Sequence, residues 1–310
     1  MGSWSALLKL AIFGATLRIA APLIYAALAT TMTERGGVVN IGVEGTMLLG
    51  CFIAVVGSSY WGPWVGVLLA AILGGLIGVL HAYLTVTIRA NQIISGTAIN
   101  ILAIGVPNLI IPAIWPGYRA GTPPVTGLPT LTLPAIANLP VLGPIIGQQS
   151  PLVYLALILV PVVHLVLFKT RFGLRLRACG EHPRAADTVG ISVSRVRYAG
   201  VIASGILAGL GGALLALSVG QYFPMMTQGR GFIGMAAMIF GNWKPGGALV
   251  ACLIFGYADA FQAAAQSVGV LSISPRFLQS LPYLLTLIAL AGLVAKSVAP
   301  AASGKPYEKG

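Results

Sequence analysis

Apolar segments long enough to cross a lipid bilayer recur along almost the whole chain. A transmembrane helix needs about 20 mostly apolar residues. Eight segments approach or meet this length, at residues 6–31, 41–58, 64–87, 92–114, 151–168, 198–219, 246–267 and 278–296. A ninth apolar segment, 231–241, is too short to cross alone as a helix. The sequence therefore predicts an all-α polytopic membrane protein.

The composition excludes a water-soluble globular protein. Charged residues make up 8% of the 310 residues, and hydrophobic residues make up 57%. Soluble domains carry about 25% charged residues, so lipid must replace water over most of this exterior. The 18 basic and 6 acidic residues give a net charge of +12. Because the bases lie mainly between apolar segments, the positive-inside rule explains them, and we expect no nucleic-acid partner.

The distribution of basic residues predicts the orientation in the membrane. Segment 169–197 carries seven basic and two acidic residues, so it should face the cytoplasm. Counting back places the loop 115–150 and the N-terminus outside. Whether 231–241 crosses decides the side of four later lysines, namely Lys244, Lys296, Lys305 and Lys309. They obey the rule only if it crosses, so we predict about nine crossings in one domain, 1–310, with the C-terminus in the cytoplasm.

An internal repeat supports this count. Residues 34–50 read ERGGVVNIGVEGTMLLG, and residues 229–241 read GRGFIGMAAMIFG; a Trp-containing hairpin and a long apolar segment follow each. The repeat halves cover about 18–115 and 197–296. With nine crossings the halves run in opposite directions and contain broken helices, as in many transporters. The alternative is a chance similarity between glycine-rich apolar segments.

Four polar residues inside apolar segments are candidates for a solute pathway: Asn40, Glu44, Asn100 and Asp259. An ionisable side chain in a membrane is costly unless it is paired or hydrated. Three of these candidates also have a structural interpretation. Glu44 could cap a helix or pair with Arg35, Asp259 could pair with a basic residue of another helix, and Asn100 could hydrogen-bond between helices.

Small residues recur at four-residue spacing in the segment 200–216, namely Gly200, Ser204, Ala208, Gly212 and Ala216, with Gly205 and Gly209 alongside. Gly74 and Gly78 repeat this spacing earlier in the chain. Small residues at that spacing let helix backbones approach closely in lipid. We therefore predict tight helix packing at these positions.

The basic segment 169–197 contains the most distinctive short motif, CGEHPRAADTVGIS. It predicts a short helix: Pro183 suits the first turn, Glu181 lies at the positive end, and Gly190 can terminate it. A compact charged helix on the cytoplasmic side is a docking surface for a partner. An ordinary solvated loop is the alternative.

Motifs for chemistry are missing from the sequence. It contains no G-x-x-x-x-G-K-[ST] phosphate loop, no zinc motif and no nucleophile–base arrangement. The three cysteines and three histidines are scattered. We expect neither catalytic residues, nor a metal site, nor a cofactor on this chain.

Three stretches together resemble one family. ERGGVVNIGVEGTMLLG (34–50), GEHPRAADTVGI (180–191) and GRGFIGMAAMIFGNWKP (229–245) are similar to inner-membrane permease subunits of ABC importers, over nearly all of the chain. The likeness is greatest to the branch that works with basic-membrane-lipoprotein-type binding proteins and takes up nucleosides. Where the family loop more often has Asn, this chain has His182.

The resemblance implies a type II ABC importer permease fold in a bacterial or archaeal cytoplasmic membrane. It implies three kinds of partner: a second, related permease, ATPase subunits that hold ATP and magnesium, and a substrate-binding lipoprotein or periplasmic protein. It also implies that the helix around 181–190 is the coupling helix seated in the ATPase, with Gly180, Glu181, Pro183, Arg184, Ala185, Asp187 and Gly190 as candidate contacts. Alternative solutes are ribose-type sugars and branched-chain amino acids, and an ion-coupled secondary transporter is a further alternative.

Overall fold

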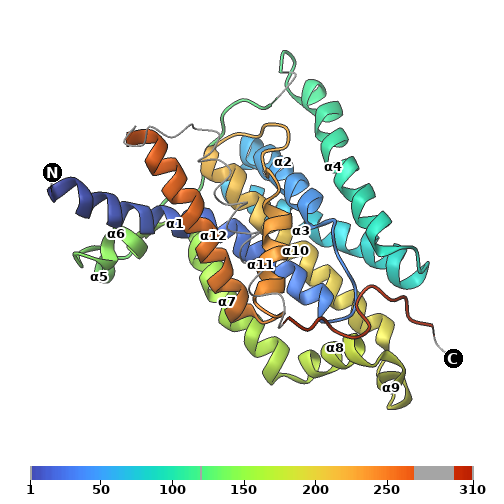
Figure 1. The fold of residues 1–310 in the computed structure, drawn as a ribbon. Coiled ribbons are helices and arrows are strands. Elements are labelled where there is room, and N and C mark those ends of the chain that lie inside the picture. The colour runs from blue at the N-terminus through green and yellow to red at the C-terminus, as the bar shows by residue number, and fades with distance from the viewer. Residues whose placement is uncertain (1, 119–120, 269–296, 309–310) are drawn as a thin grey trace.

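The computed structural model describes residues 2–118, 121–268 and 297–308, and these residues are mostly helical (Figure 1). The long helices are α1 (Gly2–Glu34), α2 (Val43–Trp61), α3 (Pro63–Ala82), α4 (Gln92–Ile114), α7 (Pro151–Lys169), α10 (Val193–Val219) and α12 (Pro245–Val268). The short elements are η1 (Tyr83–Thr87), α5 (Pro134–Ala137), α6 (Leu142–Ile146), α8 (Arg171–Glu181), α9 (Pro183–Thr188), α11 (Arg230–Phe240), β1 (Leu131–Thr132) and β2 (Gln148–Gln149). The all-α prediction is confirmed, since β1 and β2 form only a two-residue antiparallel pair.

Seven helices in the described ranges are long and apolar enough to cross a membrane. They match seven of the predicted segments to within several residues; the first candidate span runs from Ile12 to Glu34. The eighth predicted segment, 278–296, lies outside the described residues. The short apolar segment forms α11, which is 11 residues long. The count of nine crossings therefore stays a prediction.

The helices of the two predicted halves pack on one another reciprocally. Helix α1 lies against α11 and α12, while α10 lies against α2 and α3 (Figure 1). Helix α1 precedes α2 and α3 in the chain, and α10 precedes α11 and α12. Each of these two helices therefore contacts the pair of helices that follows the other one. The inverted repeat itself remains a prediction.

Glycine permits the closest of these contacts, between α3 and α10. A Cβ atom built on Gly205 would lie 2.1 Å from the carbonyl oxygen of Gly74, and a Cβ on Gly74 would lie 2.2 Å from that of Gly205. Both distances are shorter than any side chain tolerates. The predicted tight packing of these small residues is confirmed, because the two backbones touch directly.

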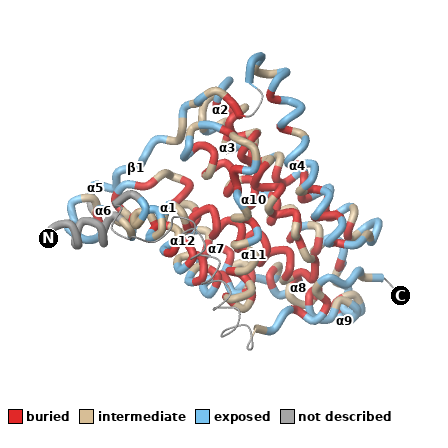
Figure 2. Tube along the Cα trace, turned by 45° about the horizontal axis from the view of Figure 1, so that its top comes forward, coloured by how far each residue is buried: buried red, intermediate tan, exposed pale blue. Residues whose placement is uncertain are grey.

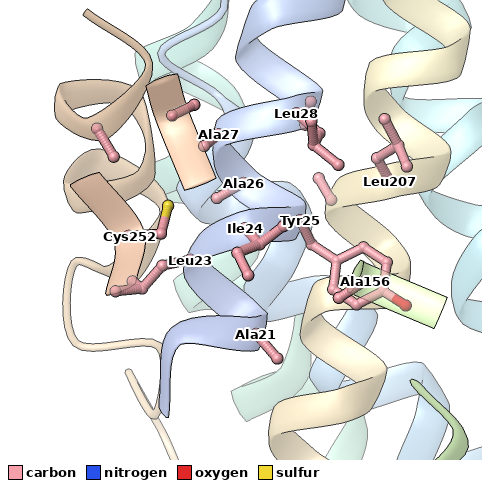
Figure 3. Packing of buried hydrophobic residues seen from close by; sticks show 14 of the residues in the cluster. Ala21, Leu23, Ile24, Tyr25, Ala26, Ala27, Leu28, Ala156, Leu207 and Cys252 are labelled. Carbon is pink, nitrogen blue, oxygen red and sulfur yellow. The ribbon is translucent and has the colours of Figure 1, made fainter. Parts of the chain in front are cut away.

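The main core surrounds α1. Figure 3 shows Leu23, Ile24 and Leu28 of this helix among buried side chains of its neighbours, including Cys252 and Leu207. Figure 2 shows that burial is concentrated in the centre of the helix bundle, whereas α4 is exposed along most of its length. The exposed residues of α4 are largely isoleucine and leucine, which suits a surface that faces lipid or another membrane subunit.

The two ends of the bundle differ. At one end, the loop 121–130 contacts the ends of α2 and α10: Ser58 donates to the carbonyl of Thr126, and the amide of Val125 donates to that of Gly220. At the other end lie α8, α9 and the C-terminal segment (Figure 1). The predicted external loop and the predicted cytoplasmic segment are thus at opposite ends.

Candidate functional site

The first turns of two helices meet inside the bundle. Helix α2 begins at Val43 after a non-helical junction, residues 38–42, and α11 begins at Arg230 after the irregular segment 221–229. A Cβ atom built on Gly231 would lie only 2.6 Å from the Cα of Glu44. Both helices therefore begin inside the bundle, and their positive N-terminal ends lie close together. The predicted broken helices stay a prediction.

The carboxylate of Glu44 lies between these two ends. Its Oε1 atom accepts hydrogen bonds from the Thr227 hydroxyl at 2.6 Å and the Gly229 amide at 2.8 Å. Its Oε2 atom accepts a hydrogen bond from the Gly231 amide at 2.7 Å. The acid thus satisfies amides at the start of α11 that have no partner within the helix. Of the two structural interpretations of Glu44, this geometry supports the cap.

Arg35 is engaged elsewhere. Its guanidinium donates to the carbonyls of Trp243 and Asn242 in the turn between α11 and α12. The indole of Trp243 in turn donates to the carboxylate of Glu34 at 2.7 Å. The end of α1 is therefore fastened to the α11–α12 turn.

Asn100 and Asn40 both hold the junction that precedes α2. The side-chain oxygen of Asn100 accepts from the amide of Gly45 at 2.7 Å, and its nitrogen donates to the carbonyl of Ile41 at 3.2 Å. Asn40 is buried and donates to the Ser204 hydroxyl at 3.4 Å. These contacts match the hydrogen-bonding alternative for Asn100; whether solute also reaches either residue remains a prediction.

Sequence reasoning missed the part that His81 plays in this junction. Its Nε2 atom lies 3.2 Å from the carbonyl oxygen of Val39, and its Nδ1 atom lies 2.9 Å from the Ser95 hydroxyl. The amide of Val39 donates to the side chain of Gln92 at 2.6 Å. A lone histidine in an apolar segment signals a buried hydrogen bond, but its partners are too distant in sequence to identify.

Asp259 lies in α12, half-buried, in the electrostatic field of Arg230. Among the described residues it forms no ion pair, so the predicted interhelical pairing is not seen as a direct contact. The ion pair that is seen in the described residues joins Arg89 to Glu308 at 3.1 Å.

A cavity of about 500 Å³ opens beside this site. It is lined by α1, the end of α10, the start of α11 and parts of 128–153, and its lining residues include Arg18 and Arg230. A volume of this order suits a small polar ligand. None of the four predicted pathway residues lines it.

The predicted docking helix is present but begins two residues later than expected. Helix α9 starts at Pro183 and ends before Gly190, whose φ of +82° is the left-handed conformation that favours glycine. Glu181 does not lie in its first turn: it ends the preceding helix α8, and its carboxylate accepts from the amide of Ala301 at 3.2 Å. Arg184 and Ala185 are exposed.

Helix α8 packs closely on the end of α1. The Gly180 backbone packs directly on the carbonyl of Arg35, since a Cβ there would lie 2.2 Å from that oxygen. Asp187 is half-buried. In the described part of the chain, no group of three or more metal-binding side chains comes together.

A family model for the permease component of branched-chain amino acid transport systems matches residues 12–290. That match spans α2, α9, α11 and most of the bundle. The chain belongs to this permease family.

Curated relatives of the permease cover nearly its whole length. The guanosine ABC transporter permease protein NupQ of Bacillus subtilis is 41% identical over 309 residues, 96% of each chain. The nucleoside ABC transporter permease protein NupC of Lactococcus lactis is 41% identical over 93% of each chain. A putative glucose ABC transporter permease protein of Haloferax volcanii, TsgC13, is 34% identical over 92% of each chain. No solved structure matches the permease.

These relatives are ABC transporter permease subunits, which are non-catalytic transport components. The permease is accordingly a multi-pass membrane subunit of an ABC transport system, not an enzyme.

Proposed function

We propose that the permease conducts nucleosides into the cell across a bacterial or archaeal cytoplasmic membrane. The observation that carries this proposal is the 41% identity, over almost the full length, to two permease proteins named for guanosine and nucleosides. A simple sugar is the second candidate, favoured by the 34% identity to the glucose permease protein. Branched-chain amino acids, from which the matching family takes its name, are a third.

The driving force comes from ATP bound with magnesium on separate ATPase subunits. The motif match in 180–191 and the exposed helix α9 support docking of an ATPase at this end of the bundle. The other partners of the complex are a second related permease and a substrate-binding lipoprotein or periplasmic protein. The loop 115–150, at the opposite end of the bundle, is the surface available to that binding protein.

The orientation follows from the basic residues. The N-terminus lies outside and the C-terminus lies in the cytoplasm, with α8 and α9 on the inner face. Helix α11 and the segment before it carry the chain from the loop end of the bundle, at Tyr222, to the end marked by Arg35. This path supports counting 220–241 as a crossing.

Transport by alternating access needs the docking helix to act on the pathway. Helix α8, which directly precedes α9, contacts Arg35 through Gly180, and Arg35 binds the α11–α12 turn, so the docking region is connected to the ends of α1 and α11. Movement of α9 would thereby shift the junction that Asn40 and Asn100 hold, and with it the cap formed by Glu44. Asp259 and Arg230 would line the route beside the cavity.

The test is uptake by the reconstituted complex. The proteoliposomes would contain both permeases and the ATPase and would be supplied with the binding protein. With ATP enclosed in the lumen, on the side that the ATPase faces, they should accumulate labelled guanosine in preference to glucose or leucine. Accumulation of glucose alone would show that the transported solute is a sugar and not a nucleoside. Uptake by this chain without ATPase, abolished by an uncoupler, would establish an ion-coupled transporter instead.

A charge reversal tests the docking role. Arg184→Glu should abolish ATP-driven uptake while the permease still inserts in the membrane, because the exposed guanidinium lies on the proposed contact surface. Wild-type uptake and assembly in this variant would refute the docking role of α9. Labelling that placed residues 181–190 outside the cell would do the same.

A further inference from the structure

The C-terminal segment 297–308 folds back over the proposed docking region. The amide of Ala302 donates to the carbonyl of Gly180 at 2.9 Å, and the amide of Ala301 donates to the Glu181 carboxylate at 3.2 Å. The amide of Gly304 donates to the carbonyl of Gly37 at 3.2 Å. The segment therefore contacts α8 and the turn after α1 at the same time.

Arg197 links the C-terminal segment to α8 through hydrogen bonds from its buried side chain. This residue of α10 is only 2% exposed. Its guanidinium donates to the carbonyl of Lys305 at 3.2 Å and to that of Cys179 at 3.3 Å. A buried arginine that bridges two backbone carbonyls fixes them relative to each other, because leaving the cation without acceptors would be costly.

An aromatic side chain closes the end of the segment. Tyr307 packs against the buried cluster of Cys179, Ala186 and Val193, which belong to α8, α9 and α10. The carboxylate of Asp187 lies near the hydroxyl of Tyr307. The segment is thus held by backbone hydrogen bonds, a buried cation and an apolar contact. It is an ordered part of the surface at this end of the bundle.

Together, α9 and this segment enclose a groove. The groove has a volume of about 710 Å³; residues 181–185 form one wall and residues 301–308 form the other. Arg184 is exposed on the first wall and Lys305 on the second. Within the ranges that the structure describes, neither cation forms an ion pair, so both are available to carboxylates of a partner.

We propose that residues 301–308 and α9 form one two-walled seat for the partner ATPase, so that the C-terminal segment is a docking element of the permease. This inference rests on the proposed function, since it takes the ATPase as the occupant. Continuity supports that choice: the second wall is joined directly to the helix that carries the docking motif. The free cations on both walls fit a protein surface that presents acidic side chains between them.

Charge reversal on each wall tests the seat. We would compare Lys305→Glu and Arg184→Glu with the matched control Lys169→Glu, which reverses an exposed lysine at the end of α7, outside the groove. Binding of the purified ATPase to the permease complex in nanodiscs is the measurement, with thermal stability of each variant checked in parallel. Among the described hydrogen bonds, Lys305 takes part only through its backbone amide and carbonyl, so replacing its side chain should leave stability unchanged.

The seat predicts that Lys305→Glu and Arg184→Glu each weaken ATPase binding about tenfold or more, which is the scale of losing one well-placed ionic contact. Lys169→Glu should bind like the wild type. If Arg184→Glu weakens binding and Lys305→Glu behaves like Lys169→Glu, the second wall is refuted while the proposed function stands. If Arg184→Glu also binds normally, the docking role of α9 fails, and the two-walled seat fails with it.

Discussion

The Oε2 atom of Glu44 lies 2.7 Å from the backbone nitrogen of Gly231. These residues are 187 positions apart, and each is the second residue of its helix. An acid at the start of one helix thus caps the start of another, and a single carboxylate serves two positive helix ends. A capping role of Glu44 and a role in the solute pathway predict different results on mutation.

Removing the carboxylate should destabilise the permease. Glu44→Ala leaves the Gly229 and Gly231 amides and the Thr227 hydroxyl without their acceptor, at a cost of about 3 kcal/mol. Glu44→Gln should cost less, because its amide still offers one oxygen. The measurement is thermal unfolding in detergent, with Thr227→Val as a one-bond control expected to lose about 1 kcal/mol. An unchanged unfolding temperature in Glu44→Gln, with an altered KM for uptake, would favour solute contact over capping.

Glycine at position 231 should be required for the same approach. Gly231→Ala would place a Cβ atom 2.6 Å from the Cα of Glu44, so the helix ends must separate, and we expect a loss of about 2 kcal/mol. Gly246→Ala is the matched control, because nothing lies within 4 Å of a Cβ there. The control should be neutral or slightly more stable, since alanine favours helix. Equal stability of the two variants in thermal unfolding would contradict the close contact.

The Glu34–Trp243 hydrogen bond should show energetic coupling. Trp243→Phe leaves the buried Glu34 carboxylate without its indole donor, which should cost about 2 kcal/mol. Glu34→Leu should be destabilising alone but should add little in the Trp243→Phe background. A double-mutant cycle on unfolding free energies measures this coupling. Strict additivity of the two losses would show that the bond contributes nothing.

Thiol labelling should report the position of the C-terminal segment. Burial raises the pKa of the Cys179 thiol, and the nearby Arg197 only partly opposes this. A raised pKa leaves less thiolate at neutral pH, so alkylation should be slow and should accelerate as pH rises.

Tyr307→Ala removes part of the cover over Cys179 and should speed its labelling several-fold. Tyr198→Ala, a tyrosine elsewhere on α10, serves as the control. Mass spectrometry of maleimide-treated membranes identifies the labelled cysteine. The same slow labelling in both variants would show that the segment does not cover this site.

The local features of the sequence were sufficient for the membrane class and for most helices. Hydrophobic length alone placed α3, α4 and α7 to within a few residues, because lipid leaves the backbone little alternative to helix. Pro183 and Gly190 likewise bracketed α9, since their effects on the backbone are local. The prediction that Glu181 lies at the start of the docking helix was wrong. Helix α8 continues through Glu181, and the carboxylate accepts a hydrogen bond from the C-terminal segment.

The partners of the polar residues depended on the tertiary structure. Apolar length determined that this chain would be a bundle of membrane helices, and glycine spacing determined that some would touch backbone to backbone. Only the fold decided that Glu44 would meet Gly231, that His81 would hold Val39, and that Arg197 would reach Lys305. Burial in lipid is a property of each segment by itself, whereas a hydrogen bond between distant residues exists only once packing has brought its two atoms together.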